Sequence, residues 1–223
     1  MRLRRGVKRG FDVVTAVVGL AILSPLMLAI WVVVRWRLGS PVLFRQCRTG
    51  MGRRRFWVMK FRTMTDRRNA RGELLPDHRR LTRLGRLLRR LSLDEIPQLV
   101  NVVRGDMSIV GPRPLLPQYD RWYTREELRR FDVRPGITGL AQVTGRNTLA
   151  WGARLRLDVR YVQRWSLWLD LMIIVRTFGV VFAREGVVDQ RSLMSDLDEE
   201  RSEAMTDELV LDAGQRELLR TAS

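Results

Sequence analysis

Cysteine and histidine are almost absent from this chain of 223 residues, which contains one of each. The only cysteine, Cys47, cannot form a disulfide within the chain, and its isolation fits a reducing compartment. The HExxH, CxxC and GxSxG patterns of zinc, redox and hydrolase sites are missing, as is the GxxxxGK(S/T) loop that cradles nucleotide phosphates. The sequence therefore carries no signature of these four kinds of site.

Lysine is scarce as well. Only Lys8 and Lys60 are lysines among 41 basic residues, which face 24 acidic ones and give a net charge of +17. Residues 185–223 hold 4 basic and 11 acidic side chains, so residues 1–184 hold 37 basic and 13 acidic ones. The body is a strong cation with an acidic tail, and such a surface attracts nucleic acid, anionic lipid or phosphorylated substrates.

One long segment has no charge at all. Residues 13–34 are uncharged, and a helix of that length extends ~33 Å, enough to span the hydrocarbon of a membrane. The segment is too long for the apolar region of a signal peptide, and RWRLGS after it is a poor cleavage site. A membrane helix is therefore expected.

Two features favour a membrane helix that enters and leaves by the same face. Ser24 and Pro25 lie in its middle, and the proline predicts a sharp bend because it removes a backbone hydrogen bond. Basic residues flank both ends, and the positive-inside rule then places both ends in the cytoplasm. A re-entrant helix over 8–36 satisfies both observations, whereas a kinked helix that crosses the membrane is the alternative.

The rest of the chain predicts a mostly helical α+β fold. VLFRQ, the turn RTGMGRR and FWVMKFRTM predict a β-hairpin over 42–64. Leucines at helical spacing in LTRLGRLLRRL predict a helix, and EIPQLVNVVRG predicts a second one that ends at Gly105. A further helix is expected near 118–131, between two loops rich in glycine and proline.

The C-terminal part combines an aromatic, apolar segment with an acidic end. Residues 151–183 predict a packed or interfacial helix in which Asp170 and Arg176 are buried. The expected organisation is a re-entrant membrane helix over 8–36, a small cytoplasmic domain with the β-hairpin and interfacial helices over 37–185, and a flexible acidic tail over 186–223.

Two adjacent carboxylates, Asp94 and Glu95, stand among arginines in SLDEIPQ. One interpretation is a helix cap: with Asp94 as the N-cap, Pro97 falls where no backbone donor is needed. The helix dipole would then depress the pKa of Asp94. The other interpretation is a phosphate site, in which arginines and a divalent metal cancel the repulsion between an attacking carboxylate and an anion. Both are open on these residues alone.

Six segments, in order over residues 8–183, resemble the bacterial sugar transferase family, the monotopic phosphoglycosyl transferases. They are SPLM, VLFRQCRTG, FWVMKFRTM, RRLSLDEIPQLVNVVRGDMSIVGPRPLLPQY, RPGITGLAQVTGRN and LDVRYVQRWSLWLDLMII. Members of this family have a re-entrant helix broken at Ser-Pro, so the resemblance favours the re-entrant form. It also identifies the cytoplasmic domain over 37–185 as a catalytic domain.

The resemblance implies transfer of a sugar 1-phosphate from a nucleotide diphosphate sugar, such as a UDP-sugar, to a polyprenol phosphate, such as undecaprenyl phosphate. The reaction would use Mg²⁺ at the cytoplasmic face of the bacterial inner membrane. Asp94 would be the nucleophile that forms a covalent phosphosugar intermediate, and would also be a metal ligand. Glu95 would be the acid/base for the lipid phosphate.

Five basic residues match positions that bind phosphate in the family: Lys60, Arg89, Arg113, Arg134 and Arg146. The structural alternatives are an Arg89 on a solvated helix face and a Lys60 that pairs with a carboxylate. A non-enzymatic alternative for the whole chain is a membrane-tethered basic module for nucleic acid or anionic lipid. Its aromatic residues lie beside apolar segments rather than within a basic groove, so no nucleic acid partner is expected.

Overall fold

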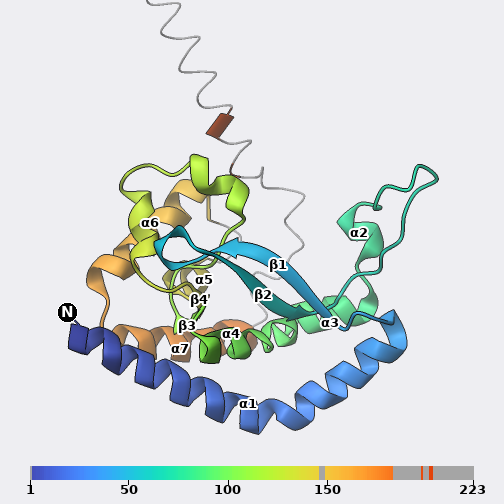
Figure 1. The fold of residues 1–223 in the computed structure, drawn as a ribbon, viewed down its shortest axis with the longest axis horizontal. Coiled ribbons are helices and arrows are strands. Elements are labelled where there is room, and N and C mark those ends of the chain that lie inside the picture. The colour runs from blue at the N-terminus through green and yellow to red at the C-terminus, as the bar shows by residue number, and fades with distance from the viewer. Residues whose placement is uncertain (1, 146–148, 183–196, 198–200, 203–223) are drawn as a thin grey trace, which may run out of the picture.

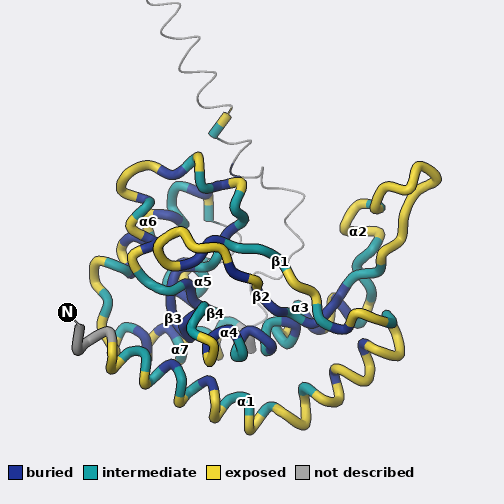
Figure 2. The backbone as a smooth tube through the Cα atoms, in the orientation of Figure 1, coloured by how far each residue is buried: buried dark blue, intermediate teal, exposed yellow. Residues whose placement is uncertain are grey.

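The computed structural model describes residues 2–145, 149–182, 197 and 201–202. Within them the chain is mostly helical, with a small β component, as predicted. The first element is the long helix α1 (Arg2–Leu38). Its apolar part is long enough to cross a membrane and has a mean hydropathy of 2.6. Figure 2 shows α1 largely exposed along its length, whereas β3 is buried and β2 is mostly buried apart from Arg55 and Trp57.

α1 is bent near its middle, and both of its arms rise toward the rest of the molecule (Figure 1). Pro25 lies inside the helix and has no N–H to donate to the carbonyl oxygen of Ala21. The Ser24 hydroxyl donates to that oxygen instead, over 2.8 Å. The predicted bend and its cause at Ser24-Pro25 are thus confirmed.

The predicted hairpin is formed by β1 (Leu43–Thr49) and β2 (Arg55–Phe61), which are antiparallel and joined by the short helix η1 (Met51–Arg53). After β2 an exposed excursion carries α2 (Asp77–Arg80) and leads to α3 (Arg83–Arg90). The turn η2 (Leu93–Glu95) joins α3 to α4 (Gln98–Arg104). α4 ends at Gly105, whose φ of 95° is the left-handed cap that the sequence predicts.

The two loops rich in glycine and proline contain a small parallel sheet that the sequence pattern did not predict. β3 (Ser108–Val110) pairs with β4 (Gly136–Thr138), with Ser108 opposite Gly136 and Val110 opposite Thr138. Instead of one helix near 118–131, there are two 3₁₀ helices, η3 (Pro117–Arg121) and η4 (Glu127–Asp132). The short helix α5 (Leu140–Thr144) follows β4.

The predicted helix over 151–183 is two helices, α6 (Trp151–Arg164) and α7 (Leu167–Phe182). Asp170 is fully buried, as expected, but Arg176 is exposed, so that part of the prediction was wrong. Figure 1 shows α7, α4 and α3 in a row between α1 and the hairpin. The central apolar cluster joins β2, α4, β3 and α7, and its buried members include Val58, Val102 and Val110.

Most of the predicted tail over 186–223 lies outside the described residues. Two of its described residues contact the body of the protein. Leu197 is fully buried in an apolar cluster with Trp151 and Leu155, and the Arg201 guanidinium lies 2.7 Å from Glu127. At these two positions the chain packs against the domain, which its acidic composition did not predict.

Candidate active site

The two adjacent acids lie in the turn between α3 and α4, but they do not cap a helix. Asp94 and Glu95 belong to η2, where the Glu95 N–H donates to the carbonyl oxygen of Ser92. Ser92 has a left-handed φ of 54°, and Pro97 precedes the first residue of α4 without any side-chain cap. The predicted N-cap role of Asp94 is therefore wrong, because the chain tightens into a 3₁₀ turn before α4 begins.

Glu95 is held by two cations that come from distant parts of the sequence. Its Oε1 lies 2.6 Å from Lys60 Nζ, on β2, and 2.8 Å from Arg113 Nη2, in the loop after β3. The Glu95 side chain is only 16% exposed, so both contacts are partly shielded from water. Lys60 thus pairs with a carboxylate, and it does so inside the site rather than elsewhere.

Asp94 has no such partner. The residue is 7% exposed, and its carboxylate makes no hydrogen bond or ion pair with any residue that the structure describes. The positive charges of Lys60, Arg89 and Arg113 nevertheless act on it. Neither carboxylate oxygen is among the buried side-chain atoms of the described residues that lack a partner, so water still reaches the group. A mostly buried carboxylate that stays open to a ligand is common at sites that bind or react.

The two acids are in different electrostatic states. Burial, and next the charge of Glu95, raises the pKa of Asp94 against the opposing effect of the cations around it. This direction is the reverse of the depressed pKa that a helix cap predicts. Burial also disfavours the charged form of Glu95, but Arg113 and Lys60 outweigh it and hold the pKa of Glu95 well below its usual range.

Contacts from other elements fix the backbone at both cations. On α4, the Asn101 side chain accepts a hydrogen bond from the Met59 N–H over 3.1 Å and donates to the Trp57 carbonyl over 2.8 Å, so it ties β2 and hence Lys60 to the helix after Glu95. A lone asparagine in the apolar run QLVNVVRG was the sequence signal for this contact, and pattern analysis missed it.

The backbone of Arg113 is bound by a buried arginine, Arg130, which sequence analysis also missed. Arg130, 3% exposed, donates to the Arg113 carbonyl over 2.6 Å and forms an ion pair of 2.9 Å with Asp158. The loop also needs glycine at 111 and 136, because a Cβ on Gly136 would lie 2.1 Å from the Gly111 nitrogen. No local periodicity in the sequence marks these contacts.

The other three predicted phosphate ligands lie in different places. Arg89 adjoins the site: its Nε donates to Thr63 Oγ1 over 3.1 Å, and its charge acts on Asp94. Arg134 does not join this cluster, since its Nε donates to the Gly105 carbonyl at the far end of α4, about 10 Å along the helix from the acids. Arg146 lies outside the described residues.

The donor set limits what kind of metal could bind here. Among the residues described, no group of three or more histidine, cysteine, aspartate or glutamate side chains could hold a metal ion. Mg²⁺ commonly takes one or two protein carboxylates and completes its shell with substrate phosphates and water. Asp94, whose oxygens have no partner among the described residues, fits that mode of binding.

Comparison with known proteins agrees with the resemblance. The model of the family described as bacterial sugar transferase matches residues 3–184. The uncharacterized sugar transferase EpsL of Bacillus subtilis is 51% identical over 180 residues, which cover 81% of this chain and 89% of the relative. A UDP-glucose:undecaprenyl-phosphate glucose-1-phosphate transferase of Caulobacter vibrioides is 43% identical over 182 residues, covering 76% of this chain and 67% of the relative.

A longer relative matches over part of its length. The undecaprenyl-phosphate galactose phosphotransferase of Salmonella typhimurium is 38% identical over 202 residues, covering 83% of this chain and 42% of the relative. With the family match over nearly all of residues 1–184 and these identities, the chain belongs to the bacterial sugar transferase family and is a transferase.

Proposed function

We propose that this protein transfers a sugar 1-phosphate from a UDP-sugar to undecaprenyl phosphate and so initiates assembly of an exopolysaccharide or related glycan. Support comes from one relative named as a transferase from UDP-glucose to undecaprenyl phosphate and from another named as an undecaprenyl-phosphate galactose phosphotransferase. Those relatives use glucose in one case and galactose in the other, so the sugar itself is left to experiment. The family match gives no support to the alternative of a basic module without catalysis.

The observation that carries the proposal is the buried, unpaired carboxylate of Asp94 beside a Glu95 that two cations already hold. A carboxylate that attacks phosphorus must approach an anionic substrate, so positive charge has to surround it. Lys60, Arg89 and Arg113 supply that charge and would bind the donor phosphates.

In the first step an oxygen of Asp94 attacks the phosphorus that carries the sugar. The bond from that phosphorus to the bridging oxygen breaks, UMP leaves with the bridging oxygen, and the sugar phosphate remains on Asp94 as an acyl phosphate. In the second step an oxygen of undecaprenyl phosphate attacks the same phosphorus. The bond to Asp94 breaks, and the carboxylate is regenerated as the lipid diphosphate sugar forms.

Glu95 is placed to assist the second step. Lys60 and Arg113 occupy its Oε1, while Oε2 makes no hydrogen bond with any described residue. Once donor phosphates draw Lys60 and Arg113 toward them, the pKa of Glu95 would rise from its low value, and Oε2 would then take the proton from a protonated acceptor phosphate as it attacks. Mg²⁺, held by Asp94 and the donor phosphates, would neutralise charge on the diphosphate.

The bent helix suits a lipid acceptor. Its exposed apolar side chains, such as Val14, Ile22 and Leu28, would lie in the hydrocarbon, while both arms return to the catalytic domain. The domain would then rest on the cytoplasmic face of the membrane, where the phosphate of undecaprenyl phosphate meets water. This is the re-entrant topology that the basic flanks indicate.

Intact-protein mass spectrometry of the full chain in detergent or nanodiscs tests the reaction. With Mg²⁺ and a UDP-sugar but no acceptor lipid, the wild type should gain the mass of one sugar phosphate and release UMP. Asp94→Asn should show no adduct and no turnover, whereas Glu95→Gln should lose turnover strongly but retain some adduct. A panel of UDP-sugars without any UMP release, or an adduct that persists in Asp94→Asn, would overturn the proposal.

A further inference from the structure

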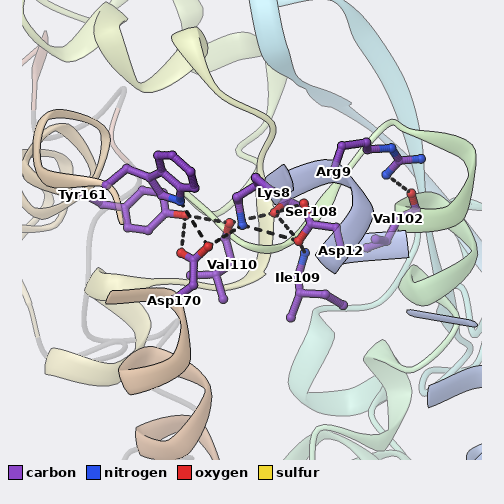
Figure 3. A network of polar contacts seen from close by, with 10 residues as sticks. Lys8, Arg9, Asp12, Val102, Ser108, Ile109, Val110, Tyr161 and Asp170 are labelled. Atoms are coloured by element: carbon purple, nitrogen blue, oxygen red, sulfur yellow. Dashed lines mark hydrogen bonds and ion pairs between the residues drawn. The ribbon is translucent and has the colours of Figure 1, made fainter. Parts of the chain in front are cut away.

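One turn of the membrane helix contacts three elements of the catalytic domain. Its polar residues, Lys8, Arg9 and Asp12, are called the anchoring turn below. They stand at the border between the basic flank and the apolar run, where a polar residue is ordinarily assigned to the membrane surface. In the structure they point into the protein instead, and Asp12 is 1% exposed (Figure 3).

Asp12 binds the strand that leads to Arg113. Its Oδ1 accepts the Ile109 N–H over 3.1 Å, and the Ser108 hydroxyl lies 2.8 Å from its Oδ2. Both partners belong to β3, which ends at Val110, and only Gly111 and Pro112 separate that strand from Arg113. Both residues of this link are held by β4: the Gly111 N–H donates to the Thr138 carbonyl and the Pro112 carbonyl accepts the Gly136 N–H, each over 2.9 Å. The position of the strand is therefore passed on to the arginine.

Arg9 binds the helix that follows the catalytic acids. Its guanidinium donates to the carbonyl oxygens of Val102, over 2.6 Å, and Val103, over 2.9 Å, at the C-terminal end of α4. The Val102 carbonyl also accepts the Gly105 N–H over 3.0 Å, so Arg9 adds a second donor to it. Carbonyls of the last helical turn generally lack a full set of partners within the helix, and a cation at that end also suits the helix dipole. The other end of α4 begins at Gln98, three positions after Glu95, so Arg9 helps to fix the helix on which the acids depend.

Lys8 completes the network through α7. Its Nζ lies 2.8 Å from Asp170 Oδ2 and 3.4 Å from Asp12, so one ammonium serves two buried carboxylates. The Tyr161 hydroxyl lies 2.7 Å from Asp170 and 2.9 Å from the Val110 carbonyl. Burial and the charge of Asp170 raise the pKa of Tyr161, which keeps its hydroxyl a donor. The network therefore returns to β3 (Figure 3).

The side chains of Arg113 and Glu95 form an ion pair of 2.8 Å. The elements next to these two residues in the chain, β3 and α4, are both bound by the same turn of α1. We propose that Lys8, Arg9 and Asp12 are positioning residues that set the separation of Arg113 and Glu95, so that the membrane helix shapes the donor site as well as anchoring the protein. The expected effect on kcat/KM rests on the proposed function. The expected effect on the stability of β3 does not depend on that function.

A double-mutant cycle separates positioning from general support of the fold. Asp12→Asn should lower kcat/KM for the UDP-sugar about 10-fold in the wild-type background, but less than about 2-fold in Arg113→Gln, because the group that Asp12 positions is then missing. Equal losses in the two backgrounds would overturn the inference. Asp132→Asn is the matched control, since Asp132 is exposed and makes no ion pair with a described residue. It should leave both backgrounds unchanged.

A second readout does not depend on activity. Hydrogen exchange over residues 108–113 should rise in Asp12→Asn and stay at the wild-type level in Asp132→Asn; unchanged exchange in Asp12→Asn would overturn the inference. If Asp12→Asn does not accumulate in membranes, Ser108→Ala, which removes a single hydroxyl, enters the same cycle and should show the same non-additivity. A wild type without turnover on any UDP-sugar would refute the proposed function, while the exchange result would still decide the anchoring of β3.

Discussion

Lys60 Nζ lies 2.6 Å from Glu95 Oε1, across 35 positions of sequence. Lys60 is one of the two lysines in a chain that otherwise uses arginine, and burial lowers its pKa while Glu95 opposes that shift. The pair places a compact cation between β2 and the catalytic turn, where it contacts one acid and acts on the other.

Replacing this cation should impair the reaction more than the fold. Lys60→Met leaves Glu95 with Arg113 alone and removes a proposed phosphate ligand, so kcat/KM for the UDP-sugar should fall about 10- to 100-fold, or about 1.4–2.7 kcal/mol. Arg45→Met is the control, because Arg45 is exposed on the paired strand and points to the other face of the hairpin. Steady-state UMP release measures both variants, and equal losses would rule out a specific role for Lys60.

Replacing either of two neighbouring arginines on α3 should slow formation of the phosphosugar adduct to very different extents. Arg89 acts on Asp94 and donates to Thr63, whereas Arg90 is exposed and makes no ion pair with a described residue. Arg89→Gln should slow formation of the phosphosugar adduct by about 10-fold or more, since a charge-assisted contact is worth about 1.5–3 kcal/mol. Arg90→Gln should stay within about 2-fold of wild type, where surface charges contribute little. A reversed order in rapid-quench measurements would contradict the assignment.

Magnesium should be needed for turnover but not for stability. The described residues contain no cluster that could hold a metal by itself, so the ion is expected to arrive with the donor diphosphate. Chelation with EDTA should abolish UMP release, and added Mg²⁺ should restore it. The Tm without substrate should be the same with and without chelator; a large decrease on chelation would point to a structural metal instead.

Local signals predicted much of the fold because they depend on neighbouring residues only. The bend at Pro25, the hairpin and the end of α4 at Gly105 follow from proline geometry, alternation and the left-handed cap. The sheet of β3 and β4 was missed, since each strand has three residues and its partner lies beyond two 3₁₀ helices. Such short parallel strands carry no periodicity of their own.

The candidate site was predicted only in part, because some of its features depend on contacts between residues far apart in the sequence. Asp94 and Glu95 stood out as adjacent acids among arginines, and the resemblance implied their roles and that of Arg113. The predicted pKa direction of Asp94 was wrong because it depends on burial that no local pattern encodes. Lys8 was assigned to the basic flank of the membrane segment, and Asp12 was given no role. Their partners lie about a hundred or more positions away, at Ser108 and Asp170, so only the folded chain reveals them.

The end of the chain should matter for stability rather than for turnover. Truncation after residue 186 removes Leu197, which is fully buried beside Trp151, and the Arg201–Glu127 pair. Loss of one buried leucine is worth about 2 kcal/mol, which lowers the Tm by about 4–8 °C for a domain of this size. Truncation after 202 keeps both contacts and should leave the Tm unchanged. Turnover at 25 °C should survive both truncations; its loss in a folded protein would make the tail part of the site.

The bend at Pro25 should decide which side of the membrane the end of α1 reaches. With Cys47→Ser as background, Gly6→Cys and Arg37→Cys introduce thiols at exposed positions on the two arms. Both should react with a membrane-impermeant reagent only when that reagent can reach the cytoplasmic face, as in permeabilised cells or inverted membrane vesicles.

Pro25→Ala restores the N–H that the Ala21 carbonyl lacks, so a straight helix can cross the membrane. Part of the Arg37→Cys population should then label from outside, with a parallel loss of turnover. Ser24→Ala is the control, because it removes only the hydroxyl bond to Ala21 and leaves the proline bend in place. Labelling of the two arms from opposite sides in the protein with Pro25 intact would mean that α1 crosses the membrane, and the re-entrant topology would be wrong.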